Sequence, residues 1–241
     1  MLLLVSGEGP SDMGSMRPLV DGLVFVPGPM TVLVNCLLEA QLFYSLLDLD
    51  SVRFVAKAEL VEAWPKHHGR QFRAPGKRKP KEAGFYFENA RRLALKAEEL
   101  ARQTEDRVLP ILFRDADGTQ SSGRGEWQAK WNSMLDGFAA GESTLGVPML
   151  PQPKSEAWLL CACREPVYQH CERLEHESGN DDAPNPLKGQ LAHARNGATS
   201  AAELVDAIHD GEIDPQRIDM SSFNAFKARL NEVMGQLVGG G

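Results

Sequence analysis

Three acidic residues follow two apolar runs of the sequence and could together bind a metal ion. Glu8 comes after the apolar residues 2–5, and Asp115 and Asp117 come after the apolar residues 108–113. Residues two apart on an extended chain point the same way, so Asp115 and Asp117 can present both carboxylates to one cation. Carboxylate oxygens suit Mg²⁺, whereas Zn²⁺ favours histidine and thiolate. The pattern therefore predicts a divalent-metal site.

The elements that must position these acids are two buried strands in an alternating pattern. Apolar segments at 2–5, 108–113 and 145–150 are typical of strands, and residues 82–103, 126–140 and 155–163 have helical patterns. Strands that alternate with helices predict an α/β fold with a mainly parallel sheet of about four strands, sandwiched by helices. In such a sheet, functional groups collect beyond the carboxyl ends of the strands, where these acids lie.

The remaining segments predict further helices around this sheet. Towards the amino terminus we expect a helix at 17–23, a long apolar helix at 31–47 and a strand at 52–60. Beyond residue 166 the strand pattern ends, and 187–195, 200–208 and 221–237 are typical of helices. We therefore expect a catalytic core at 1–165, with a long insertion near 23–50, and a helical extension at 166–241 packed on the same domain.

The charge of the chain is unevenly distributed. The 241 residues include 26 Lys and Arg against 33 Asp and Glu, which gives a net charge of −7. Residues 66–81 nevertheless contain seven basic residues and no acid. A basic loop of this kind can track a nucleic-acid backbone, although charged runs are often only solvated surface. Phe72 and Phe85 lie within or just after it and could add stacking.

The order and spacing of three motifs resemble the Toprim domain of topoisomerases, primases and overcoming-lysogenization-defect nucleases. The first motif is Val-Ser-Gly-Glu-Gly-Pro-Ser-Asp at 5–12, and the second is Asp-Ala-Asp-Gly at 115–118. The third, Glu-Ala-Trp-Leu-Leu at 156–160, is similar to an element of small stand-alone bacterial Toprim-like proteins. The resemblance covers residues 1–165, and the long hydrophobic stretch at 23–47 departs from some members of the family.

The resemblance implies a Mg²⁺ or Mn²⁺ site for phosphoryl transfer. Glu8 would be a metal ligand or a general acid/base, and Asp115 and Asp117 would hold the metal. By position, Asp12 and Glu156 are the further candidate ligands. Two cations in such a site bridge the phosphate and activate water. The candidate catalytic residues are Glu8, Asp115, Asp117 and Lys154.

The basic residues supply the candidate nucleic-acid contacts. Arg114 and Lys154 adjoin the acids and could either bind a substrate phosphate or neutralise carboxylates. The full predicted set is Lys66, Arg70, Arg73, Lys77, Arg78, Lys79, Lys81 and Arg114.

These patterns lead to one functional hypothesis and one alternative of another class. The hypothesis is a bacterial, cytoplasmic, Mg²⁺- or Mn²⁺-dependent nuclease that hydrolyses DNA or RNA in phage defence or nucleic-acid processing. The alternative is a non-hydrolytic Toprim subunit that binds metal and nucleic acid and acts with an ATPase partner. The sequence contains no Gly-x-x-x-x-Gly-Lys-Ser/Thr loop, so ATP hydrolysis of the usual kind would come from that partner. The oligomeric state stays open, a homo-oligomer included.

A minor alternative is a phosphatase similar to the haloacid dehalogenases. The motif at 115–119 also matches the first motif of that family, in which the first Asp is the nucleophile. Residues 179–182, Gly-Asn-Asp-Asp, imitate its last acidic motif. The preceding segment lacks an apolar strand, and Glu8 would have no explanation in this alternative.

The cysteines lead to an expectation about redox state, and the apolar segments lead to expectations about packing and membrane insertion. Four cysteines in a chain of this length are expected to be reduced thiols, and Cys161 and Cys163 are two apart on one helix, so they do not face each other. Trp158 is expected to be a packing residue. The amino-terminal apolar run is far shorter than the ~20 residues of a membrane span, so we expect no membrane insertion and a cytoplasmic location.

Overall fold

A computed structural model describes residues 1–7, 9, 11–20, 22–62, 81–116 and 124–238. Glu8 and Asp117, two of the predicted site residues, lie outside these ranges, and so do the predicted nucleic-acid contacts from Lys66 to Lys79.

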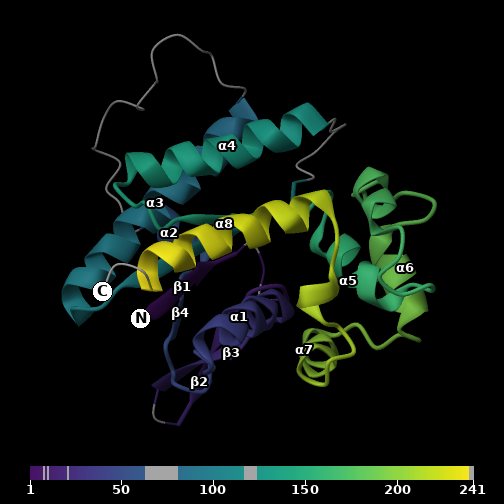
Figure 1. The fold of residues 1–241 in the computed structure, drawn as a ribbon, viewed down its shortest axis with the longest axis horizontal. Coiled ribbons are helices and arrows are strands. Elements are labelled where there is room, and N and C mark those ends of the chain that lie inside the picture. The colour runs from purple at the N-terminus through teal and green to yellow at the C-terminus, as the bar shows by residue number, and fades with distance from the viewer. Residues whose placement is uncertain (8, 10, 21, 63–80, 117–123, 239–241) are drawn as a thin grey trace.

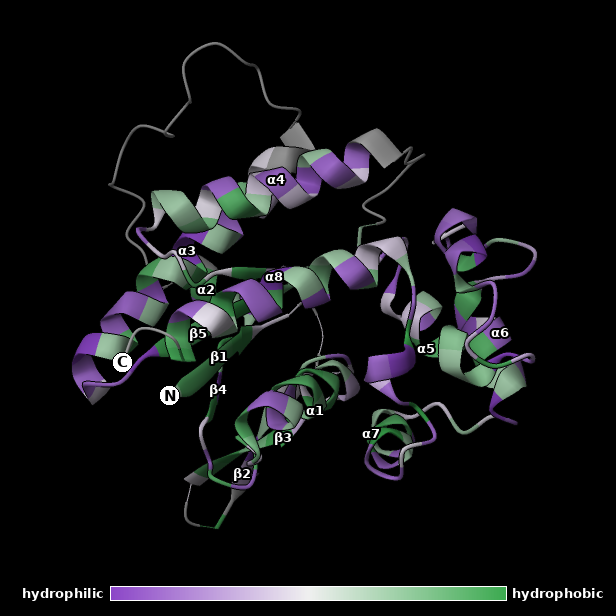
Figure 2. Ribbon diagram, in the orientation of Figure 1, coloured by the Kyte–Doolittle hydropathy of each residue, from purple (hydrophilic) through white to green (hydrophobic). Residues whose placement is uncertain are grey.

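The centre of the fold is a parallel sheet of four strands, as the alternating pattern predicts (Figure 1). The strands are β1 (Leu2–Ser6), β4 (Val52–Phe54), β5 (Val108–Phe113) and β6 (Val147–Met149), in the order β4-β1-β5-β6. Every residue of β5 is buried, which is why this strand has a continuous apolar sequence. Figure 2 shows the same hydrophobic character along β1.

Helices cover both faces of the sheet. On one face, α3 (Lys81–Thr104) and α4 (Arg124–Ala140) share a hydrophobic core with Leu4 and Leu112. On the other face, α1 (Pro29–Leu42), α5 (Ser155–Cys163) and α8 (Ser221–Val238) pack with Leu3 and Ile111. In Figure 1, α3 and α4 lie above the sheet and α1 lies below it. The α/β sandwich expected from the sequence is confirmed.

The segment between β1 and β4 differs from the prediction. Residues 17–23 form no helix, because β2 (Gly14–Leu19) and β3 (Gly22–Pro27) pair as an antiparallel hairpin. Gly22, next to the hairpin turn, has a positive φ of 142°, and Gly14, at the start of β2, has a positive φ of 106° in a place where a Cβ would collide with the Val26 carbonyl. The apolar helix is confirmed, but it ends at Leu42 because Phe43 adopts a left-handed conformation with φ of 63°. Of the strand expected at 52–60, only the first three residues form a strand, β4, and α2 (Lys57–Glu62) follows.

The C-terminal helices complete the core on the α1 side. After α5 come η1 (Cys171–His176), α6 (Leu187–Ala194), α7 (Ala201–His209) and η2 (Pro215–Arg217), and then α8. These elements share one hydrophobic cluster with the sheet, and Trp158 of α5 is its largest fully buried side chain. Trp158 packs against Phe223 and Phe226, and its indole Nε1 donates to Ser222 Oγ at 2.9 Å. Trp158 is therefore a packing residue, as expected.

One expectation about the cysteines is wrong. Cys161 of α5 and Cys171 of η1 form a disulfide, whereas Cys36 and Cys163 are free. Cys161 and Cys163 share α5, where residues two apart do not face each other. The turn after α5 instead returns the chain to Cys161, where the Tyr168 N–H donates to the Cys161 carbonyl.

In the part of the chain that the structure describes, no helix combines the length and the apolar character required to cross a membrane.

Candidate active site

The strand order places a topological switch point at the carboxyl ends of β1 and β5. From β1 the chain moves to β4 on one side, and the later strands β5 and β6 lie on the other side. The loops that leave β1 and β5 therefore diverge, and in open parallel sheets this is where ligands bind. Of the predicted acidic residues, Glu8 and Asp12 follow β1 in the chain and Asp115 and Asp117 follow β5, whereas Glu156 lies in α5.

Two of these acids converge on a single residue, Ser155. The Ser155 backbone N–H donates to Asp115 Oδ1 at 3.0 Å, and the Ser155 hydroxyl donates to Asp12 Oδ1 at 3.2 Å. Asp12 follows β1 and Asp115 follows β5, so residues 103 positions apart in the chain have their carboxylates at one point. Both side chains are half-buried.

Asp115 is held by the neighbouring strand end and by α3. The Ala116 N–H donates to the carbonyls of Pro151 and Pro153 at 3.1 Å, so the chain after β5 lies against the chain after β6. Tyr86 of α3 donates its hydroxyl to the Asp115 carbonyl at 2.8 Å. The buried ammonium of Lys130 donates to the Ala116 carbonyl. These bonds fix the backbone on both sides of the Asp115 carboxylate.

Asp12 is held by the start of α1. Its carbonyl accepts from the Met30 N–H at 2.9 Å, and the Thr31 hydroxyl donates to the Met13 carbonyl at 2.6 Å. The Ser11 hydroxyl donates to Asp12 Oδ2 at 3.2 Å. The hairpin β2–β3 and α1 therefore return to the carboxyl edge of the sheet and orient Asp12 towards Ser155.

The amino terminus of α5 stabilises this accumulation of negative charge. Ser155 is the first residue of α5, and Lys154 precedes it in an extended conformation with no side-chain cap. The N–H groups of the first turn have no partners within the helix, and the helix dipole is positive at this end. The Asp115 carboxylate accepts one of these N–H groups, which serves as a cap and fixes the carboxylate in place.

Lys154 is paired with an acid from the C-terminal region. Its ammonium lies 2.8 Å from Asp181 Oδ1, and this hydrogen bond holds the pKa of the Asp181 carboxyl below its ordinary value. Asp181 lies in the loop between η1 and α6. The pair places the Gly-Asn-Asp-Asp loop beside the switch point, which the sequence analysis did not expect.

The remaining predicted metal ligands are only partly described. Glu156 is half-buried, and its Oε2 lies 3.5 Å from the Ser155 hydroxyl, on the same residue that binds Asp12 and Asp115. Glu8 and Asp117 fall outside the described ranges. Within those ranges, no group of three or more His, Cys, Asp or Glu residues is arranged to hold a metal ion.

The donors that are present nevertheless suit a hard cation. Asp12 and Asp115 supply carboxylate oxygens, and one accepted hydrogen bond leaves a carboxylate with further lone pairs. Ser6, the last residue of β1, has a buried hydroxyl with no hydrogen-bond partner among the described parts of the chain. The oxygen character of this edge therefore fits Mg²⁺ or Mn²⁺.

Arg114 occupies a different position from the predicted one. Its side chain is 0% exposed, and its guanidinium donates to the Asn89 side chain at 3.0 Å and to the Phe113 carbonyl at 2.6 Å. A buried guanidinium does not reach a nucleic-acid backbone by direct contact, so that part of the prediction is wrong. Arg114 instead anchors α3 to the end of β5. Lys81 begins α3, but its side chain is not described.

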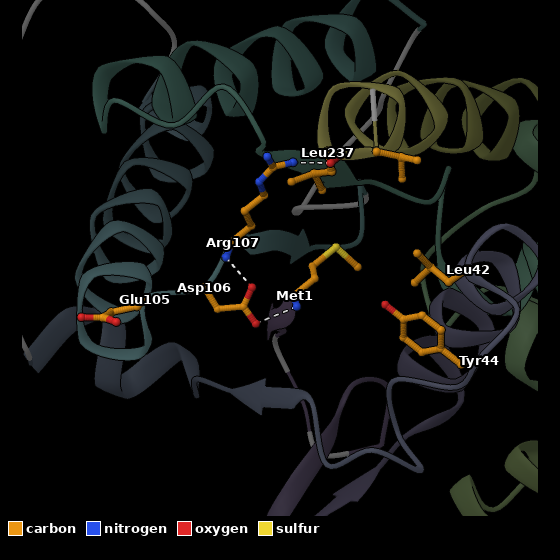
Figure 3. A pocket seen from close by; sticks show the side chains of 8 residues that line it. Met1, Leu42, Tyr44, Glu105, Asp106, Arg107 and Leu237 are labelled. Atoms are coloured by element: carbon orange, nitrogen blue, oxygen red, sulfur yellow. Dashed lines mark hydrogen bonds and ion pairs between the residues drawn. The ribbon is translucent and has the colours of Figure 1, made fainter. Parts of the chain in front are cut away.

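A cavity of about 570 Å³ lies at the opposite end of the sheet, beside the residues that precede β1 and β5 (Figure 3). We call this end of the sheet the amino edge, and the end where the strands finish the carboxyl edge. It is lined by Met1, Leu42, Tyr44, Glu105, Asp106, Arg107, Leu237 and Val238. The Met1 amino group pairs with Asp106 at 2.6 Å, and Arg107 donates to the Leu237 carbonyl. None of the predicted site residues that the structure describes lines this cavity.

The sequence analysis missed three residues of the site. Ser155 had only a general signal, since serine is frequent at the starts of helices. Asp181 was noticed only as part of a phosphatase motif. Lys130 had no local signal, because it lies on α4 and reaches the Ala116 carbonyl only through the tertiary fold.

Comparisons with known proteins return no relative: no family model matches the chain, and no curated protein or solved structure matches it. The function proposed for this site therefore depends on the geometry of this chain and on the three motifs.

Proposed function

We propose that this protein is a Toprim-type nuclease that hydrolyses phosphodiester bonds with Mg²⁺ or Mn²⁺. The observation that carries the proposal is the convergence of Asp12 and Asp115 on Ser155 at the switch point of the sheet. Bringing carboxylates together is electrostatically unfavourable, because like charges raise each other's free energy. A cation bound between them offsets that repulsion.

The residues of this edge divide into a metal-holding set and a charge-balancing set. Asp12 and Asp115, with Glu8, Asp117 and Glu156, would hold the metal. A bound divalent ion would neutralise phosphate charge and activate water. Lys154 lies beside Ser155 and would balance the negative charge that develops on the phosphate. Asp181 orients Lys154 through their ion pair.

The experiment is a cleavage assay on supercoiled plasmid, single-stranded DNA and structured RNA, with Mg²⁺, Mn²⁺ or EDTA. We expect metal-dependent cleavage by the wild type and its loss in Glu8→Gln and Asp115→Ala prepared identically. Equal cleavage by wild type and both variants would show that a contaminant cuts. A wild type that binds Mn²⁺ at these acids and cuts nothing would point to the non-hydrolytic subunit, whose ATPase partner would then be sought by co-purification.

A second candidate function comes from the Lys154–Asp181 pair. The pair brings Asp181, part of the segment 179–182 that imitates the last acidic motif of the haloacid-dehalogenase-like phosphatases, close in space to Ser155, which binds Asp115 of the motif at 115–119. In that reaction Asp115 would attack a phosphomonoester. Hydrolysis of p-nitrophenyl phosphate that Asp115→Ala abolishes, with no cleavage of any nucleic acid, would favour the phosphatase over the nuclease.

A further inference from the structure

The amino edge of the sheet presents apolar side chains to solvent around its cavity. Leu42 and Tyr44 line one side of the cavity (Figure 3), and the last two residues of α8 also line it. Phe43, between Leu42 and Tyr44 in the chain, is 91% exposed, and Leu49, in the loop that leads to β4, is 60% exposed. The apolar surface therefore extends beyond the cavity, which is more typical of a protein–protein contact than of a site for one small ligand.

Two loops form this surface, one on each side of the start of β1. The first two amide groups of β1 donate to the carbonyls of Ser51 at 2.9 Å and of Arg107 at 2.8 Å, which precede β4 and β5. The loop 43–51 and the turn 105–107 therefore flank the same end of the sheet. The candidate active site lies at the carboxyl edge, so a partner that docks at the amino edge leaves that site accessible.

The backbone conformation of Phe43 is unfavourable for the fold alone. Phe43 ends α1 in a left-handed conformation with φ of 63°, and its N–H donates to the Glu39 carbonyl at 2.8 Å. Glycine and asparagine are usual at such a position, because a bulky side chain strains left-handed backbone. The exposed ring also gains little from burial in the fold. A residue that combines strain with an exposed apolar ring points to a role outside the fold.

The rim of the surface is acidic. Residues 39–53 and 105–107, all of which the structure describes, contain five acids and two arginines. Arg53 is bound to the Asp50 carboxylate and to two nearby backbone carbonyls, and Arg107 is bound to the last turn of α8. The helices α1, α3 and α8 also end here, and the carboxyl ends of helices carry partial negative charge. The rim therefore attracts positive charge and repels a second copy of itself.

We propose that the amino edge is a docking surface for a basic amphipathic segment of a partner protein. The apolar side chains of that segment fill the cavity and cover Phe43 and Leu49, and its lysines and arginines face the acidic rim. The cavity of about 570 Å³ lies within the range of binding pockets, about 300–1,000 Å³, so it can accept an anchoring side chain. The inference goes beyond the nuclease proposal and does not depend on it.

The test is fluorescence anisotropy of a labelled, helical, amphipathic peptide of leucine, tryptophan and lysine, added to the full chain at low and at high salt. We expect the peptide to bind, and to bind more weakly as salt screens the acidic rim. The same peptide with glutamate in place of lysine, and a lysine peptide of scrambled order, should not bind.

Phe43→Asn should weaken binding of the lysine peptide at least about tenfold, as for the loss of an aromatic anchor. Its urea midpoint should equal or exceed that of the wild type, because asparagine suits the left-handed conformation. Leu49→Ser is a second variant, with a smaller expected loss of binding. Leu23→Asn is the matched control, because Leu23 is 68% exposed but lies on β3 of the hairpin, and its binding should equal that of the wild type.

Four binding results would overturn the inference: no binding of the lysine peptide, equal binding by wild type and Phe43→Asn, an equal loss in Leu23→Asn, or equal binding of the glutamate peptide. A lower urea midpoint in Phe43→Asn would also overturn it, since the ring would then serve the fold. A wild-type dimer that Phe43→Asn converts to a monomer in light scattering would assign the surface to a second copy instead. Cleavage by Phe43→Asn should equal that of the wild type, so failure of the docking surface and failure of the nuclease are distinguishable.

Discussion

The two edges of the sheet use their charged residues in opposite ways. At the amino edge, around the cavity of about 570 Å³, charges fasten the chain: Asp106 binds the Met1 amino group and Arg107 binds the end of α8. At the carboxyl edge, carboxylates of the same sign gather on Ser155. The first arrangement lowers the free energy of the fold without a ligand. The second would gain stability from a bound cation if the proposed metal site is correct, and it lies at the edge without the large cavity.

The largest expected effect concerns the contact between α5 and α8, the helix whose last turn reaches the cavity. Trp158→Ala should lower the free energy of unfolding by about 3–5 kcal/mol, because it empties a fully buried site and removes the bond to Ser222. Leu237→Ala, at the cavity, should cost less, about 2 kcal/mol, since space is already present there. Urea unfolding of both variants measures the difference. Equal losses would mean that the two ends of α8 are equally well packed.

The next effect compares the cleavage rates of two variants, one with a substitution at the carboxyl edge and one with a substitution at the amino edge. Asp115→Asn keeps an oxygen for the Ser155 N–H but removes the charge, so metal-dependent cleavage should fall at least about a hundredfold, the equivalent of several kcal/mol of lost charge stabilisation. Asp106→Asn should leave the cleavage rate unchanged. Initial rates at saturating Mn²⁺ give both values. A loss of rate in Asp106→Asn would mean that the reaction takes place at the amino edge and not at the carboxyl edge, as we propose.

A smaller effect is expected when the bond that orients Asp12 is removed. Ser155→Ala keeps the N–H bond to Asp115 and loses the hydroxyl bond to Asp12, together with the longer 3.5 Å contact to Glu156. Loss of a group that orients a metal ligand typically costs about tenfold to a hundredfold in metal affinity. A Mn²⁺ titration of the cleavage rate should show a higher half-saturating concentration with a similar maximum. An unchanged titration curve would mean that Asp12 holds no metal.

The strong sequence patterns predicted the framework of the site. The ranges expected for α3, β5, α5 and α8 differ from the observed ones by at most two residues at either end, because each combines a clear apolar period with a turn or cap at its ends. The hairpin at 14–27 was missed although Asp-Gly at 21–22 lies between apolar runs, a common hairpin signal. The prediction of a helix at 17–23 does not take this Asp-Gly pair into account.

The contacts that complete the site depend on tertiary structure and had no local signal. The Lys154–Asp181 pair and the Cys161–Cys171 disulfide each join α5 to the segment that follows it. Both contacts form because residues 164–186, which include η1, return the chain to α5. Neither the apolar periodicity nor the residue spacing of this segment predicts that course of the chain. Arg114 is expected from its place beside the acids either to bind a substrate phosphate or to neutralise carboxylates. In the folded chain its guanidinium is buried and donates to the Asn89 side chain and to the Phe113 carbonyl, contacts that only the tertiary structure creates.

The smallest expected effect compares two equally exposed ion pairs at the two ends of α5. Asp181 is 64% exposed and pairs with Lys154 at the start of α5, whereas Glu212 is 62% exposed and pairs with Arg195 near Cys163 at its end. Exposed pairs contribute less than about 1 kcal/mol, so Asp181→Asn and Glu212→Gln should lower stability slightly and similarly at pH 7.

Only Asp181→Asn should change the reaction. Of the two acids, only Asp181 orients the ammonium of Lys154, which precedes Ser155 at the candidate site. We expect the KM of Asp181→Asn for nucleic acid to rise by up to about fivefold with little change in kcat, which matches the loss of one exposed ion pair. The pKa of Asp181 is lowered in the folded state, so its contribution to stability is present above the ordinary carboxyl range. That contribution is lost as the pH falls through the lowered pKa, and the urea midpoints of wild type and Asp181→Asn should converge there. Equal KM values for Asp181→Asn and Glu212→Gln would show that Lys154 does not contact the substrate, and that its ion pair only fastens the chain, as the charges of the amino edge do.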